Sequence, residues 1–108
     1  MEVLTRDEVA PGRVELRGSM DIYAAAELHE RLLELLRTRQ RLELDLSGVD
    51  EIDTSGVQLL MSTKRAAAAQ GRALSLVAHS PAVLETLELC QLLAFFGDPV
   101  VETAGVRS

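Results

Sequence analysis

The sequence of 108 residues contains no tryptophan and a single cysteine, and its aromatic content is only 3%. Because Cys90 is alone, it cannot form an internal disulfide, and it has no second thiol at the spacing of a zinc-ligand pair. Basic residues are also scarce, since 11 Lys and Arg stand against 17 Asp and Glu, which gives a net charge of −6. Binding to nucleic acid or to anionic membranes draws on clustered Lys and Arg. We therefore expect no direct nucleic-acid partner.

Long apolar runs are absent as well. The apolar stretch at residues 92–96 is bounded by Gln91 and Gly97, whereas a membrane helix needs roughly 18 or more consecutive apolar residues. The N-terminal residues lack the basic flank and apolar stretch of a signal peptide. The sequence also has neither a phosphate-binding glycine loop nor metal-ligand spacing, so we expect no cofactor and no metal. We predict a cytoplasmic protein without membrane insertion.

The sequence has ample material for one folded domain. It is 47% hydrophobic and 26% charged, close to the averages of soluble globular proteins, and its length suffices for a single core. Residues 3–5 and 13–17 flank the turn residues Pro11 and Gly12, which predicts an N-terminal hairpin. Aliphatic residues recur at helical spacing over residues 22–38, and Asp21 is placed to cap that helix.

The second half of the sequence alternates strands and helices. Residues 42–46 read LELDL and predict a strand with one buried face, followed by a turn-rich connector at residues 47–53. A second helix is expected over residues 56–70, with Gly71 at its C-terminal end, and a strand over residues 74–78. Ser80 and Pro81 are typical of a helix start. We expect Cys90 to be a small core residue of that third helix.

This order of elements predicts an α/β fold. Strands separated by helices favour right-handed crossovers and a mixed, mainly parallel central sheet of about four to five strands covered by helices, with the hairpin at its edge. No linker or internal repeat divides the chain. We therefore predict one domain over residues 1–108, with its core at about residues 13–96.

Residues 50–57, which read DEIDTSGV, are the most informative segment for function. Ser55 falls in the first turn of a predicted helix, where unpaired backbone N–H groups and the helix dipole can accommodate a phosphate on the hydroxyl. The neighbouring acids oppose that charge. Residue types alone favour a simpler interpretation, in which Asp53 or Thr54 caps the helix and Ser55 is a small first-turn residue.

Several segments together resemble the STAS domain family, named for sulphate transporters and anti-sigma factor antagonists. Residues 44–57 (LDLSGVDEIDTSGV) are similar to the core signature of the family, and residues 18–21 (GSMD) to the segment that leads into its first helix. Residues 71–74 (GRAL) and 80–83 (SPAV) resemble the beginnings of its later strand and helix. The resemblance covers about residues 13–96 in the order and spacing of the family. One departure is CQL at residues 90–92, where the family often has a glycine-leucine pair.

The resemblance implies a regulatory role without enzymatic activity. In bacterial anti-sigma factor antagonists, the serine of the Asp-x-Ser-Gly turn is phosphorylated by a partner that is also a kinase, and the matching residue is Ser55. Asp53 and Asp21 match acids near the same surface, Thr54 is a less favoured acceptor, and Gly56 shapes the turn. The implied partners are an anti-sigma factor with serine-kinase character and a phosphatase. A monomer or weak dimer is expected.

Other functions stay open at this stage. The same resemblance extends to STAS proteins of chemotaxis signalling and to STAS subunits that dock on the ATPase of a lipid-transporting ABC complex. Among enzymes, the DTSG sequence at residues 53–56 is superficially similar to the Asp-Thr-Gly turn of aspartic proteases, but that fold is nearly all strand. A Ser-His-Asp hydrolase is not supported, because Ser55 lacks the Gly-x-Ser-x-Gly elbow.

Overall fold

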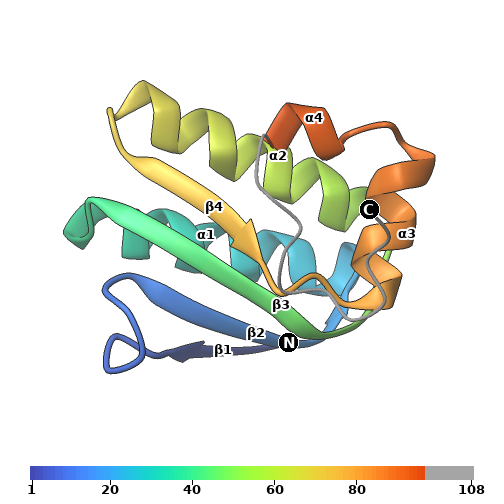
Figure 1. The fold of residues 1–108 in the computed structure, drawn as a ribbon, viewed down its shortest axis with the longest axis horizontal. Coiled ribbons are helices and arrows are strands. Elements are labelled where there is room, and N and C mark those ends of the chain that lie inside the picture. The colour runs from blue at the N-terminus through green and yellow to red at the C-terminus, as the bar shows by residue number, and fades with distance from the viewer. Residues whose placement is uncertain (97–108) are drawn as a thin grey trace.

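The structure, a computed structural model, describes residues 1–96 (Figure 1). Within these residues, an N-terminal hairpin is followed by alternating helices and strands and then by two consecutive helices. In chain order they are β1 (Glu2–Thr5), β2 (Arg13–Met20), α1 (Ile22–Thr38), β3 (Arg41–Ile52), α2 (Thr54–Ala69), β4 (Ala73–Val77), α3 (Pro81–Leu89) and α4 (Leu93–Phe96).

The strands form one sheet in the order β1-β2-β3-β4. The hairpin pair β1 and β2 is antiparallel, while β2, β3 and β4 run parallel to one another. Right-handed crossovers between neighbouring parallel strands bring successive helices to the same face, and α1 and α2 indeed lie together on one face of the sheet (Figure 1). The predicted α/β domain with a mixed, mainly parallel sheet and an N-terminal hairpin at its edge is confirmed.

The core lies between the sheet and these two helices. In β3, Leu42, Leu44 and Leu46 alternate with polar residues and are at most 1% exposed, because they face the helices. On the opposite face of the sheet, Arg13 pairs with Glu43 at 3.0 Å and with Asp45 at 3.6 Å. These residues of β2 and β3 therefore give this face of the sheet a polar centre.

The ends of α1 and α3 agree with those predicted from the sequence. Helix α1 spans the predicted residues 22–38, and the Asp21 carboxylate caps it. The Ser80 hydroxyl accepts a hydrogen bond from Val83 N at 3.2 Å, with Pro81 as the first helical residue of α3. Gly71 follows α2 with φ of +68°, a left-handed conformation that glycine adopts without steric cost.

The prediction of a turn-rich connector at residues 47–53 is wrong. Strand β3 continues through Ile52, and its extra length is taken up by two register shifts against β2. Asp45 pairs with Glu15 and Gly48 with Arg17, so β3 has one residue more than β2 over this stretch. A Cβ on Gly48 would lie 2.7 Å from Arg17 Cγ. The turn-type residues therefore mark a β-bulge within a strand.

The predicted burial of Cys90 is also wrong. Cys90 is exposed and forms the C-cap of α3. The buried residues of this helix are Val83 and Leu87, and the helix ends at Leu89, so Cys90 lies beyond the part of α3 that packs on the core. Beyond it, α4 is held by the Lys64 ammonium, which donates to the carbonyls of Leu74 at 2.8 Å and Phe96 at 2.9 Å. No helix within residues 1–96 has the length and apolar character needed to cross a membrane.

Candidate functional site

The candidate site lies where α1 and α2 begin. Met20 and Ile52, the last residues of β2 and β3, are paired neighbours in the parallel sheet. Each is followed by one aspartate and then by a helix, so Asp21 and Asp53 occupy equivalent N-cap positions side by side. The fold thus gathers the sequence-predicted residues of both helix starts at one edge of the sheet.

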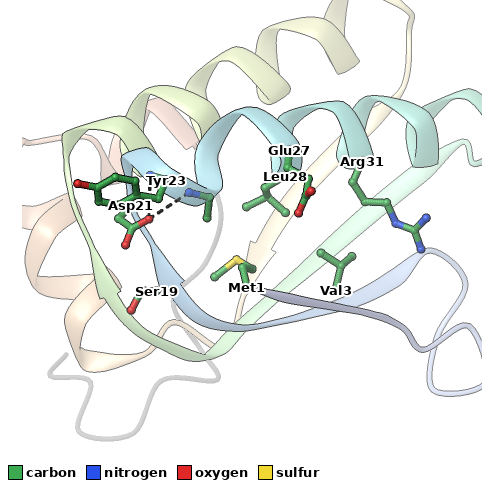
Figure 2. A pocket seen from close by; sticks show the side chains of 9 residues that line it. Met1, Val3, Ser19, Asp21, Tyr23, Glu27, Leu28 and Arg31 are labelled. Carbon is green, nitrogen blue, oxygen red and sulfur yellow. Dashed lines mark hydrogen bonds between the residues drawn. The ribbon is translucent and has the colours of Figure 1, made fainter.

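The two cap carboxylates have different sets of partners. Asp21 Oδ1 accepts from Tyr23 N at 3.0 Å and Ala24 N at 3.1 Å, both within α1 (Figure 2). Asp53 Oδ1 accepts from Gly56 N at 3.2 Å within α2, while its Oδ2 accepts from Ile22 N at 3.3 Å in α1. Asp53 therefore links the two helix starts in addition to capping its own helix.

Ser55 is the second residue of α2 and is half-buried, while Thr54, the first residue, is exposed. The Ser55 hydroxyl is thus carried on the first helical turn, the turn at which backbone N–H groups and the positive end of the helix dipole are directed outward. A group of negative charge on this hydroxyl would be favoured by the helix and opposed by the nearby aspartates.

Gly56 is buried directly beneath this turn. A Cβ at this position would lie 2.5 Å from the Met20 carbonyl oxygen and 2.9 Å from Ile52 Cγ1. Because glycine carries no side chain, the first turn of α2 can lie against the ends of β2 and β3. The absence of a side chain at Gly56 therefore lets the turn that carries Ser55 lie close to the sheet.

The surface around the two helix starts combines negative charge with exposed apolar groups. Ser19 Oγ donates to Asp50 Oδ1 at 3.3 Å and to Glu51 Oε1 at 3.2 Å, so two more carboxylates border the site. Ile22 is 65% and Tyr23 is 92% exposed.

The exposure of Ile22 and Tyr23 is not predicted from the sequence. Tyr23 lies four residues before Glu27, on the polar side of the helix, and this spacing is the signal that could have revealed its exposure. These two side chains give the site an apolar component that a protein partner can cover.

A shallow groove of about 680 Å³ continues from the site along α1 (Figure 2). It runs between that helix and the N-terminal strand, with Met1 and Val3 on one side and Leu28 on the other. Its polar lining comes from Ser19, Asp21, Glu27 and Arg31. Within residues 1–96, no group of three His, Cys, Asp or Glu side chains is arranged to hold a metal ion.

Comparison with known proteins agrees with this architecture. The family model described as "Mlab, STAS domain" matches residues 3–95. This protein belongs to the STAS domain family.

Solved structures share the fold at low sequence identity. An anti-sigma factor antagonist from Mycobacterium paratuberculosis is 23% identical, with a TM-score of 0.74 over 94% of this chain and 86% of that chain. The anti-sigma factor antagonist SpoIIAA in its unphosphorylated form is 19% identical, with a TM-score of 0.69 over 94% and 89%. The Bacillus cell fate determinant SpoIIAA in its phosphorylated form is 18% identical, with a TM-score of 0.65 over 94% and 92%.

Proposed function

We propose that this protein is a non-enzymatic regulatory binding module of the anti-sigma factor antagonist type, whose partner binding is switched by phosphorylation of Ser55. The observation that carries the proposal is the half-buried Ser55 in the first turn of α2, which Asp53 ties to the start of α1, where Ile22 and Tyr23 are exposed. Similarity to anti-sigma factor antagonists, one of them solved in a phosphorylated form, supports it.

The proposed switch acts through charge and desolvation. In the unmodified state, a partner lies closely over the small hydroxyl and covers the apolar side chains of Ile22 and Tyr23. A phosphate adds about −1.5 to −2 charges and three acceptor oxygens that must stay solvated or paired. It would also add negative charge to the edge of the sheet where the carboxylates of Asp21 and Asp53 lie. Close apposition of the two proteins then becomes unfavourable.

We prefer Ser55 over Thr54 as the phosphate acceptor because Ser55 matches the serine of the family motif. Thr54 is the more exposed of the two, so exposure alone does not decide between them. Peptide mapping by mass spectrometry after phosphorylation decides the question. We expect phosphate on Ser55 in the wild type and in Thr54→Val, and no phosphate in Ser55→Ala.

The proposed partners are an anti-sigma factor with serine-kinase activity and a phosphatase that restores the hydroxyl, all in the cytoplasm. Affinity capture from extract of the source cells, with the unmodified protein as bait, tests this assignment. Recovery of a histidine-kinase-like anti-sigma factor supports the proposal. Recovery of chemotaxis receptors or of a transporter ATPase as the main partner would contradict it.

A further inference from the structure

Strand β1 is an open edge of the sheet. It pairs with β2 on one side, and within residues 1–96 no strand lies on its other side (Figure 1). Helix α1 packs on β2 and β3 rather than on β1, and the groove of about 680 Å³ lies between α1 and the residues Met1 and Val3. The outer backbone groups of β1 are therefore accessible to an incoming strand.

The register of the hairpin determines which backbone groups of β1 point outward. Arg6 N donates to Arg13 O at 2.8 Å, so these two residues form a hydrogen-bonded pair of the antiparallel ladder. Such pairs occur at every second residue along a ladder of this kind. The N–H and C=O groups of Val3 and Thr5 therefore point away from β2, toward the open edge.

These outward groups complement one another when two copies of β1 pair antiparallel about a two-fold axis. If Val3 of one copy lies opposite Thr5 of the other, both residues exchange hydrogen bonds with their partners and Leu4 faces Leu4. The same register places Glu2 of each copy opposite Arg6 of the other. The registers centred on Val3 or on Thr5 would instead place Glu2 opposite an apolar residue or an acid. Opposite charges across a strand pair are stabilising, so they select the first register.

The side chains of Glu2, Leu4 and Arg6 share the face of the sheet that points away from α1, because side chains alternate along a strand and Val3 faces α1 (Figure 2). Glu2 is exposed and has no ion pair within residues 1–96. Arg6 contacts Glu15 only through Nε, at 3.1 Å. The two terminal nitrogens of its guanidinium therefore remain for a second carboxylate.

We propose that a second copy of this protein adds its β1 to the open edge of β1, with Leu4 at the two-fold axis and Glu2 of each copy paired with Arg6 of the other. This pairing joins the two four-stranded sheets into one continuous sheet. Strand addition supplies main-chain hydrogen bonds, and the self-complementary order of charges identifies a second copy as the occupant. Strand β1 has only 4 residues, so the dimer is weak. The dimer does not depend on phosphorylation of Ser55.

Thr5→Pro in the full chain tests the backbone pairing. The N–H of Thr5 points outward, so proline removes a donor that only the dimer uses, and an edge strand tolerates proline in this orientation. We expect Thr5→Pro to raise the dimer dissociation constant, measured by sedimentation equilibrium, at least tenfold. Thr5→Val keeps the N–H and is the matched control, with a dissociation constant within about twofold of the wild type.

Charge reversal tests the register. E2R and R6E each place like charges opposite one another at both ends of the pairing, so we expect each to raise the dimer dissociation constant at least tenfold. E2R also lowers the net negative charge of each copy, so a general charge effect would strengthen association instead. An equimolar mixture of E2R and R6E recovers dimers, because the two bases of one copy face the two acids of the other.

Controls separate these effects from changes in net charge or folding. E85R makes the same charge change as E2R on α3, which packs on β3, and it does not weaken the dimer. Circular dichroism verifies that every variant is folded. A wild type that stays monomeric up to roughly 1 mM overturns the proposal. Dimers that persist unchanged in Thr5→Pro also overturn it, as does a mixture of E2R and R6E that associates no better than either variant alone.

Discussion

The carboxylate of Asp53 accepts a hydrogen bond from the backbone N–H of Ile22, 31 residues earlier in the chain, at 3.3 Å. The same carboxylate caps α2 through Gly56 N. One side chain therefore satisfies donors in the first turns of two helices, and it ties together the exposed residues of α1 and the turn that carries Ser55. The geometry of the candidate site depends on this shared contact.

Replacing Asp53 with alanine removes both hydrogen bonds. Loss of an N-cap costs about 1 kcal/mol, and loss of the second acceptor adds to it, so Asp53→Ala should lower the free energy of unfolding by about 1–2 kcal/mol. Urea denaturation measures this change. Asp53→Asn, which keeps one oxygen acceptor, serves as the control and should lose clearly less. Equal stability of Asp53→Ala and the wild type would show that the link to Ile22 is not formed.

Gly56→Ala should destabilise the domain even though alanine is the better helix former. A Cβ at this position would lie 2.5 Å from the carbonyl oxygen of Met20, which belongs to the backbone and cannot easily move away. We expect a loss of about 1–3 kcal/mol, the range for overpacking, against a gain of up to about 1 kcal/mol in helix propensity. Thermal unfolding is the measurement, and Ser55→Ala is the matched control in the same turn. A stabilised Gly56→Ala would contradict the close packing.

The sequence contains the information for most of the fold because its signals are local. The caps Asp21 and Ser80 and the turn residue Gly71 each act within one or two turns of their helix, so composition and spacing predict them. The same holds for the alternation in residues 42–46. The grouping of Asp21 with Asp53 follows from parallel strand order, which the helix-strand alternation also predicts.

The remaining features depend on long-range contacts. Ser47 and Gly48 have turn propensities, yet they lie within β3 because β2 continues to pair with that strand across its bulges. Cys90 follows the apolar spacing of α3 but lies beyond the point at which the core ends. The link from Asp53 to Ile22 joins two elements far apart in sequence, and no local pattern encodes it.

Glu15 should make the domain more stable at neutral pH than in acid. Hydrogen bonds from Arg17 at 2.9 Å and from Arg6 at 3.1 Å lower the pKa of this carboxyl below its ordinary value of 4.5. A lowered folded-state pKa contributes stability above the unfolded value, and this contribution is lost as the pH falls through the folded value. Urea denaturation of the wild type and Glu15→Gln should therefore differ at neutral pH and converge well below pH 4.5. A difference that does not change with pH would contradict this assignment.

Lys64→Met should loosen α4. The ammonium donates to the carbonyls of Leu74 and Phe96, and hydrogen bonds to charged groups contribute about 1.5–3 kcal/mol when well shielded. Because Lys64 is only half-buried, we expect a loss of about 1 kcal/mol and faster amide exchange in α4. Lys64→Arg, which retains the charge and donors, should lose less. Unchanged amide exchange in α4 would show that Phe96 is held by packing alone.

The measurement that tests the central claim most directly is calorimetric titration of the captured partner into the wild type, Ser55→Ala and Ser55→Asp. We predict that Ser55→Ala binds within about twofold of the wild type, while Ser55→Asp binds at least tenfold more weakly, a difference of at least about 1.4 kcal/mol. Equal dissociation constants for the two variants would mean that charge at Ser55 does not control partner binding.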